Sequence, residues 1–153
     1  MVPIVDFQEH LRPFFVMPYL HLGSLKDEIS QIPLAEGETD DLLFQGLTVL
    51  DHLHSRGVTY RDLKPENIFV ESRSPLPMQF TDFGLANDLP DLKIICGTER
   101  YAAPEIFTWE KYTTTVDIWS LGVIILKNVY GLPTQHLQAR EGRVAALREQ
   151  GLA

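Results

Sequence analysis

Four polar residues along one stretch of the chain have the types and spacing that phosphoryl transfer requires. Asp62 is followed two residues later by Lys64 and five residues later by Asn67, and Asp82 comes fifteen residues after Asn67. In such a transfer a carboxylate accepts the proton of the attacking hydroxyl, a cation neutralises the moving phosphate, and Asn and Asp oxygens hold magnesium. A single turn aspartate more often bonds local backbone, so the hypothesis depends on all four residues together.

Longer motifs surround these residues. Residues 60–70 read YRDLKPENIFV, residues 82–84 read DFG, residues 97–105 read GTERYAAPE, and residues 117–122 read DIWSLG. In this order they closely resemble the catalytic loop, the metal-binding turn, the end of the activation segment and the following helix of eukaryotic protein kinases. The lysine of the loop resembles the serine/threonine-specific form. The resemblance implies transfer of the ATP γ-phosphate to Ser or Thr of a protein substrate, with ATP and Mg²⁺ as cofactors.

The resemblance gives each of the first four residues a role. Asp62 orients and deprotonates the acceptor hydroxyl, Lys64 stabilises the transferring phosphate, and Asn67 with Asp82 binds magnesium and thereby the nucleotide. It also implies an adenine site built from the strand and hinge segment FFVMPYL at residues 14–20. Four residues are expected to contact adenine there: the gatekeeper Met17, the carbonyl of Pro18, the backbone of Leu20, and Phe69 as the floor.

Two residues near the GTERYAAPE motif resemble the substrate-facing loop of the family. They are Thr98 and Tyr101, and a threonine at the first position can hydrogen-bond Asp62 and Lys64. Glu105 at the end of the motif would pair with an arginine of a later helical loop. The arginines that follow it in this sequence come too early to be that residue: Arg140, Arg143 and Arg148.

The residues that flank Asp62 and Asp82 match structural and regulatory positions of the family. Tyr60 stands where the family most often has histidine, and it is expected to pack under Phe83 and above Asp117; Gly84 completes the DFG turn. Arg61 often binds a phosphorylated activation-loop residue in the family. Residues 85–96 contain no Ser, Thr or Tyr, so we expect no such switch here. Either Asp88 or Asp91 pairs with Arg61 instead, or both are solvated.

Apolar periodicity and turn residues predict the elements that position these groups. Strands are expected at 2–7, 14–17, 68–70 and 78–81. Ser24 is expected to cap a short helix, and 33–37 to form a loop. A longer helix is expected at 39–55, capped by Thr39 or Asp40, with Gly57 after its end and an apolar stripe of Leu42, Leu43, Phe44, Leu47, Leu50, Leu53 and His54. The helix at 116–126 should be buried all round, and 138–150 forms a helical tail.

We therefore expect an α+β fold of the protein kinase type. It consists mainly of the helical C-terminal lobe, with two strands of the small lobe and the hinge, over residues 1–132; residues 133–153 are an unassigned tail. The sequence contains no glycine-rich loop, no upstream lysine for the α- and β-phosphates, and no regulatory helix with its glutamate. A chain truncated in this way is expected to be inactive by itself and to expose apolar surface along 116–126.

Composition excludes several other classes. The chain has 153 residues, a formal charge of −8 and no basic face, which argues against nucleic-acid binding. Cys96 is the single cysteine, so neither an internal disulfide nor a cysteine zinc site is expected. The longest apolar stretch, 121–126, is too short to span a bilayer, and no signal peptide occurs in 1–10. We expect an intracellular protein, cytoplasmic or nuclear, whose oligomeric state the sequence leaves open.

Two alternatives stay open beside the protein kinase. The first is a non-catalytic, pseudokinase-like module that binds a partner through exposed helical surfaces. The second is a small-molecule phosphotransferase, which shares the Asp and Asn loop. The segment GTERYAAPE argues against the second, because that element serves protein substrates.

Overall fold

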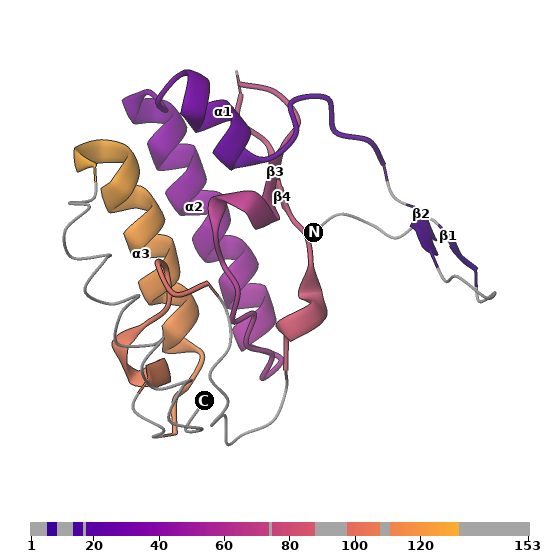
Figure 1. The fold of residues 1–153 in the computed structure, drawn as a ribbon, viewed down its shortest axis with the longest axis vertical. Coiled ribbons are helices and arrows are strands. Elements are labelled where there is room, and N and C mark those ends of the chain that lie inside the picture. The colour runs from indigo at the N-terminus through magenta and orange to yellow at the C-terminus, as the bar shows by residue number, and fades with distance from the viewer. Residues whose placement is uncertain are drawn as a thin grey trace, which may run out of the picture.

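Three α-helices and four short strands occur in the part of the chain that the computed structural model describes, which is residues 6–8, 14–16, 18–73, 75–87, 98–107 and 111–131. The helices are α1 (Leu25–Gln31), α2 (Glu36–His54) and α3 (Thr115–Tyr130). The strands are β1 (Asp6–Gln8), β2 (Phe14–Val16), β3 (Ile68–Val70) and β4 (Met78–Phe80). Figure 1 shows α2 and α3 side by side, with α1 near one end of α2.

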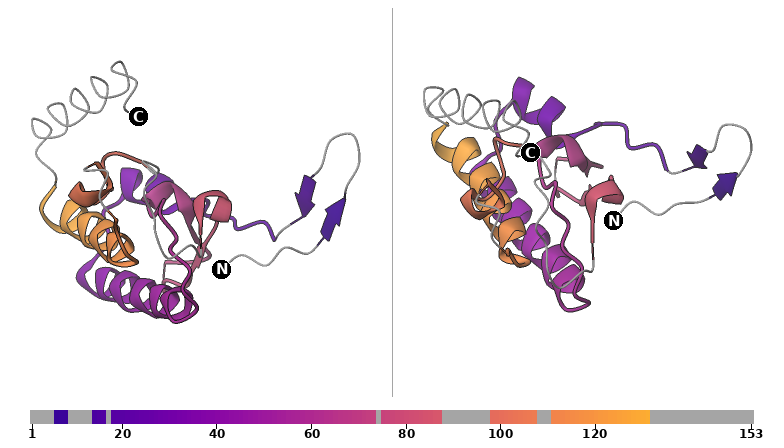
Figure 2. Two further views of the ribbon diagram at one scale, coloured as in Figure 1. Left: turned by 90° about the horizontal axis from the view of Figure 1, so that it is seen from below. Right: turned by 60° about the horizontal axis from the view of Figure 1, so that its bottom comes forward.

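The strands form two separate antiparallel pairs. In the first pair Asp6 lies opposite Val16, and in the second Ile68 lies opposite Phe80. All four expected strands are therefore present, although β1 extends to Gln8, one residue past the expected end; residues 2–5 of the first expected strand lie outside the described residues. Figures 1 and 2 show the β1–β2 pair standing away from the helices, whereas β3 and β4 lie against them. The expected tail at 138–150 lies outside the described residues.

Ser24 caps the first helix, as predicted. The Ser24 hydroxyl accepts a hydrogen bond from the Asp27 N–H at 3.3 Å, and Asp27 Oδ2 accepts one from the Ser24 N–H at 3.2 Å. This reciprocal pair satisfies two backbone donors that the first turn leaves without helical partners. The side-chain hydrogen bond from Ser24 also lowers the pKa of the Asp27 carboxyl.

The second helix begins at Glu36, so the expected loop at 33–37 is confirmed for residues 33–35 only, and the expected cap at Thr39 or Asp40 is wrong. The Ala35 N–H donates to Glu38 Oε2 at 2.8 Å, and the Thr39 hydroxyl donates to the Ala35 carbonyl at 2.9 Å. A glutamate in the first turn therefore satisfies the end of the helix in place of a cap side chain. Arg73 holds that same carboxylate at 2.6 and 2.7 Å. Hydrogen bonds from Arg73 and from Ala35 lower the pKa of Glu38 from 4.5 to about 2.

Gly57 follows the C-terminal end of α2, as expected. Its φ is +74°, and the next N–H, of Val58, returns to the Leu53 carbonyl at 3.0 Å. Glycine adopts this left-handed conformation without the steric cost that a side chain adds. The chain thereby reverses at the end of α2 and runs toward the catalytic loop.

The main core lies between α2, α3 and the β3–β4 pair, and α2 approaches α3 closely at Gly46. A Cβ atom at that position would lie 2.9 Å from Leu121 Cδ1. Of the predicted stripe on α2, the buried apolar residues are Leu42, Leu50 and Leu53. His54 is half-buried, and the other three residues are exposed, which corrects the prediction: Leu43 (40%), Phe44 (74%) and Leu47 (42%).

The third helix buries one face only, so the expectation of burial all round is wrong. Its buried residues are Val116, Asp117, Ser120, Leu121 and Ile124. Its exposed apolar residues are Ile118, Trp119, Leu126, Val129 and Tyr130. In the described part of the chain α3 packs against elements on one side, and the opposite side faces solvent. None of the described helices is both long enough and apolar enough to cross a membrane.

Candidate active site

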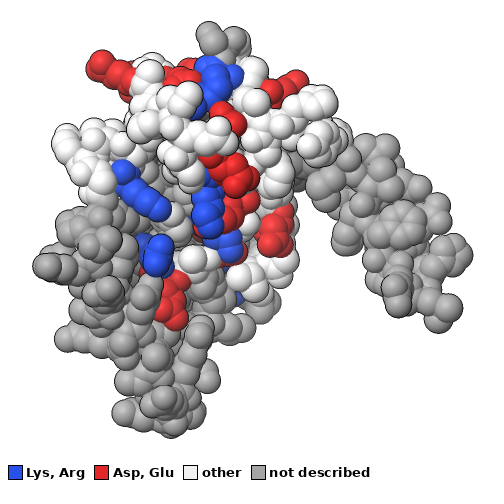
Figure 3. Space-filling model, turned by 45° about the horizontal axis from the view of Figure 1, so that its top comes forward, with Lys and Arg blue, Asp and Glu red and all other residues white. Residues whose placement is uncertain are grey.

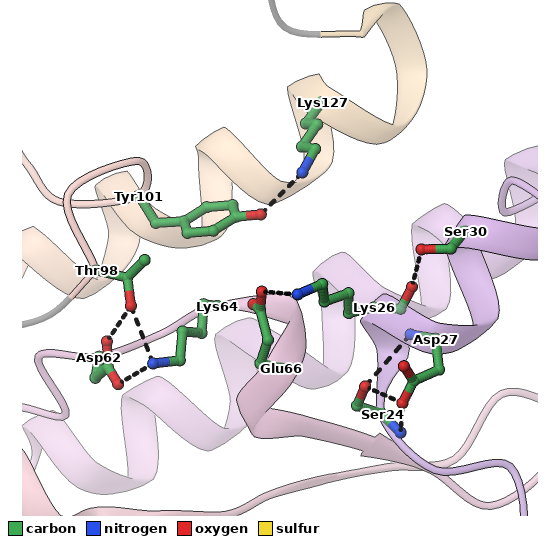
Figure 4. A network of polar contacts seen from close by, with 10 residues as sticks. All are labelled: Ser24, Lys26, Asp27, Ser30, Asp62, Lys64, Glu66, Thr98, Tyr101 and Lys127. Atoms are coloured by element: carbon green, nitrogen blue, oxygen red, sulfur yellow. Dashed lines mark hydrogen bonds and ion pairs between the residues drawn. The ribbon is translucent and has the colours of Figure 1, made fainter. Parts of the chain in front are cut away.

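A cluster of three polar side chains forms the centre of the candidate site. Lys64 Nζ lies 2.6 Å from Asp62 Oδ2, and the Thr98 hydroxyl donates to Asp62 Oδ1 at 2.9 Å. The same hydroxyl accepts a hydrogen bond from Lys64 Nζ at 3.0 Å. Figure 4 shows the three side chains converging from the catalytic loop and from the segment that starts at residue 98. The contacts that the sequence predicted for Thr98 are thus present.

Asn67 fixes the other side of the same aspartate. Its Nδ2 donates to the Asp62 carbonyl at 2.9 Å and to Asp62 Oδ2 at 3.1 Å. Both side chains are buried, with 6% and 8% exposure. The short 3₁₀ turn Pro65–Asn67 places the amide there. Because the amide nitrogen bonds to Asp62, the side-chain oxygen of Asn67 is the atom suited to a cation.

The backbone before Asp62 is held by a buried carboxylate of α3. Asp117 Oδ2 accepts from the Tyr60 N–H and Asp117 Oδ1 from the Arg61 N–H, each at 2.8 Å. Arg61 has a φ of +69°, a left-handed conformation that costs a non-glycine residue about 1–2 kcal/mol. His54 Nε2, at the end of α2, lies 2.8 Å from Asp117 Oδ2. The histidine contact was missed, because no local pattern joins residues 54 and 117.

Tyr60 packs against the DFG turn. Its ring lies edge-on to that of Phe83, with the centroids 5.0 Å apart, and its hydroxyl donates to the Thr81 carbonyl. Burial raises the pKa of the Tyr60 phenol, so the side chain stays a neutral donor. The packing expected for Tyr60 with Phe83 is therefore present, and the contact with Asp117 is made by the Tyr60 backbone N–H.

The second acidic residue of the motif lies at the end of β4. Asp82 is exposed, has a φ of +52°, and accepts a hydrogen bond from the Gly84 N–H at 3.3 Å. The Thr81 N–H donates to the Asn67 carbonyl at 2.9 Å, which brings the backbones of the DFG turn and the catalytic loop together. In the described ranges no three or more His, Cys, Asp and Glu side chains are placed so that they could hold a metal ion together.

Asn67 and Asp82 offer a hard cation oxygen atoms only. Mg²⁺ prefers oxygen ligands and is commonly bound through one or two protein groups together with waters and phosphates. The donor set therefore fits magnesium, and Asn67 and Asp82 are the residues that would hold it.

The side chain of Arg61 lies beside the DFG turn. Its Nε donates to the Leu85 carbonyl. Its Nη1 is buried and has no hydrogen-bond partner among the residues that the structure describes. The expected partners Asp88 and Asp91 lie outside those residues, so their pairing with Arg61 stays a prediction.

The adenine contacts can be placed only in part. Met17 lies outside the described residues, Pro18 is exposed, and Leu20 and Phe69 are half-buried. The Leu20 carbonyl accepts a hydrogen bond from the Gly23 N–H at 3.1 Å, and Ser24 bridges to Phe69. Glu105 is half-buried in a 3₁₀ turn that starts at Pro104. The roles that the sequence assigned to these residues stay predictions.

The matches with known proteins agree with this geometry. The family model described as protein kinase domain matches residues 4–151. The chain belongs to the protein kinase family. Its fold is that of a partial kinase domain dominated by the helices of the C-terminal lobe, as the sequence predicted.

Curated relatives of this kinase chain are serine/threonine and cAMP-dependent protein kinases. It is 36% identical over 131 residues to cAMP-dependent protein kinase type 3 of Saccharomyces cerevisiae, covering 82% of the chain and 31% of the relative. It is 35% identical over 131 residues to the cAMP-dependent protein kinase catalytic subunit of Arthrobotrys oligospora, covering 82% and 24%. A serine/threonine-protein kinase of Drosophila melanogaster is 33% identical over 135 residues, with 85% and 18% covered. The chain thus spans less than a third of the length of these kinases.

Two side-chain contacts of lysines beside the catalytic cluster, an ion pair and a hydrogen bond, were not predicted from the sequence. Lys26 Nζ lies 3.0 Å from Glu66 Oε1, and Lys127 Nζ donates to the Tyr101 hydroxyl at 3.0 Å. Each joins residues that are far apart in the chain, so spacing gave no signal for either.

Figure 3 shows the molecule with the α1 end of Figure 1 turned toward the viewer. Basic and acidic side chains are mixed on this face.

Proposed function

We propose that these residues form the catalytic centre of a serine/threonine protein kinase, which transfers the γ-phosphate of ATP to a hydroxyl of a protein substrate. The observation that carries the proposal is the contact of Asp62 with Lys64, Thr98 and Asn67 at 2.6–3.1 Å. This cluster combines a fixed carboxylate, a cation and an amide in the arrangement that phosphoryl transfer uses.

The buried carboxylate of Asp62 has the position of the proton acceptor. Asn67 and Thr98 restrict its rotation, and Oδ1, which accepts from Thr98, has a second lone pair that can accept the proton of an incoming hydroxyl, while Oδ2 stays bonded to Lys64 and Asn67. The ammonium of Lys64 lies beside that carboxylate, where negative charge accumulates on the transferring phosphate. Magnesium and ATP, when bound, supply the phosphoryl group and neutralise part of its charge.

The role of Asp62 can be tested in a protein that carries these 153 residues together with a glycine-rich loop and an upstream lysine. We expect Asp62→Asn to lower kcat by about 10²- to 10⁴-fold and to leave the affinity for ATP unchanged. The matched control is Asp51→Asn, which makes the same change on the exposed face of α2. If Asp62→Asn keeps most of the parent's kcat, the assignment is wrong.

For the 153-residue chain alone we expect weak, magnesium-dependent ATP binding and no protein phosphorylation. These residues include the metal ligands, but no glycine-rich loop and no lysine before the hinge, and loss of one such stabilising donor costs about 10²–10³ in rate. Labelled ATP titrated with and without Mg²⁺ measures the first expectation. A serine peptide incubated with radiolabelled ATP measures the second, with Asp82→Ala as the inactive control.

A second candidate function is a non-catalytic binding module. It is favoured by the exposed apolar residues of α2 and α3, which include Phe44 at 74% exposure and Trp119 at 45%, because such surfaces on a soluble protein often bind partners. The two functions separate experimentally. Asp62→Asn should abolish phosphoryl transfer and leave the binding of a partner protein intact. Phe44→Glu should abolish the binding of that partner and leave phosphoryl transfer intact.

A further inference from the structure

A pocket of 430 Å³ opens beside the catalytic cluster. Its walls come from α1, from the turn Pro65–Asn67, from the segment that begins at residue 98, and from α3. The residues that matter for its chemistry are Lys26, Glu66, Thr98, Arg100, Tyr101 and Lys127. Figure 4 shows Lys127 and Tyr101 on one side, Lys26 and Glu66 on the other, and Thr98 toward the catalytic residues.

The pocket is positively charged, although the chain as a whole carries −8. Its lining contains three basic residues, Lys26, Arg100 and Lys127, and one carboxylate. That carboxylate belongs to Glu66, whose Oε1 lies 3.0 Å from Lys26 Nζ. The hydrogen bond with Glu66 raises the pKa of Lys26, so the ammonium of Lys26 is stabilised. Lys127 adds a further positive charge to the wall of the pocket.

Lys127 is the cation best placed to bind an anion. Its Nζ donates to the Tyr101 hydroxyl at 3.0 Å and lies 5.5 Å from the centre of that ring. Neither contact neutralises its charge, and across the described part of the chain Lys127 has no ion pair. The contact with Tyr101 instead holds the side chain at the pocket wall, which lowers the entropy that binding an anion costs.

The pocket is contiguous with the proposed site of transfer. Thr98 lines the pocket, and its hydroxyl lies within 2.9 Å of Asp62 Oδ1 and 3.0 Å of Lys64 Nζ. A peptide whose hydroxyl reaches Asp62 would therefore place a nearby side chain in the pocket, because an extended chain advances only about 3.3 Å per residue.

We propose that the pocket selects an anionic side chain, Asp, Glu or a phosphorylated residue, close to the acceptor serine or threonine of the substrate, with Lys127 as the main determinant. This inference rests on the proposed function and names the class of substrate. A basic side chain is disfavoured because it would approach Lys127, although Glu66 Oε2, which is buried and has no hydrogen-bond partner among the described residues, can still accept a hydrogen bond from a neutral donor.

Binding of labelled serine peptides to the 153-residue chain tests the inference without requiring turnover. The peptides are identical except for one residue, Glu, phosphoserine, Gln or Lys, which is moved through the positions next to the acceptor. Fluorescence anisotropy gives each Kd. We expect Glu to bind about tenfold more tightly than Gln at one position, which corresponds to about 1.4 kcal/mol. Phosphoserine should bind at least as tightly as Glu, and added salt should weaken both.

Reversing the charge should reverse the preference. In Lys127→Glu we expect the Lys peptide to bind more tightly than the Glu peptide, and in Lys127→Gln we expect no discrimination. Arg56→Glu is the control, because it changes the net charge equally at an exposed residue that does not line the pocket. Circular dichroism verifies that each variant is folded.

The parent chain alone suffices to overturn the inference. Equal binding of the Glu and Gln peptides at every position would overturn it, as would tighter binding of the Lys peptide or no binding of any peptide. Competition by inorganic phosphate without a dependence on peptide position would mean a free-anion site, which also contradicts it. A preference for Glu without any phosphoryl transfer, even when a glycine-rich loop and lysine are supplied, would support the pocket and refute the proposed function.

Discussion

Replacing the buried carboxylate of Asp117 by an amide should destabilise the protein markedly. Its two oxygens accept the Tyr60 and Arg61 N–H groups at 2.8 Å each, and the side chain is 1% exposed. The amide of Asp117→Asn has one acceptor oxygen. It can keep one of these hydrogen bonds in a weaker neutral form, while its NH₂ group faces the other buried N–H.

The magnitude follows from the hydrogen bonds lost. Changing a charged acceptor to a neutral one costs about 1 kcal/mol, and leaving a buried N–H without an acceptor costs about 1–3 kcal/mol. The sum is about 2–4 kcal/mol. The amide also avoids the cost of burying a charge, so we expect a net loss of about 2 kcal/mol. The free energy of unfolding of a whole domain is about 5–15 kcal/mol, so this loss is a large part of it.

Urea unfolding followed by circular dichroism measures the effect. With an m-value of about 2 kcal/mol/M, a loss of 2 kcal/mol lowers the midpoint by about 1 M. Asp51→Asn provides the matched control on an exposed face of α2 and should change stability by less than about 0.5 kcal/mol. The loss of one N–H contact and the weakening of the other should also raise hydrogen exchange at Tyr60 and Arg61. Equal midpoints for the two variants would refute the reasoning.

Two further predictions concern α2. Glu38 has a pKa of about 2 in the folded protein, against an ordinary value of 4.5. Its contribution to the free energy of unfolding should therefore be complete above about pH 4.5 and lost as the pH falls toward 2. Unfolding midpoints measured across this range should depend less on pH in Glu38→Gln than in the parent, and an unchanged dependence would contradict the pairing with Arg73. Gly46→Ala should destabilise by about 1–2 kcal/mol, because overpacking against Leu121 outweighs the gain in helix propensity. Gly37→Ala, with nothing within 4 Å, should instead stabilise by up to about 1 kcal/mol, and thermal melts that show equal gains for both would refute the close approach.

Features with a local cause could be predicted from the sequence. The cap at Ser24 and the turn at Gly57 each depend on residues within a few positions of one another. The spacing of Asp62, Lys64 and Asn67 likewise lies within one loop, so the motif itself predicted their proximity. Short β-strands next to turn residues were found for the same reason.

Features that depend on distant parts of the chain could not be predicted. Helix α2 starts early because Glu38, supported by Arg73 from beyond the helix, satisfies its first turn. Phe44 has the apolar character of a core residue, but only the position of α3 decides which face of α2 is covered. The contact of Lys127 with Tyr101 spans 26 residues and has no sequence signature.

The hydrogen bonds of Asp117 also place a constraint on the order of folding. They join it to Tyr60 and Arg61 across 57 and 56 residues of sequence. A ribosome completes the catalytic loop well before it makes α3, and contacts of such separation close late because the intervening loop must first be ordered. We therefore expect the backbone of the loop to reach its final conformation only after α3 has been synthesised and has docked. In a nascent chain, the geometry around Asp62 would then be among the last parts of this domain to form.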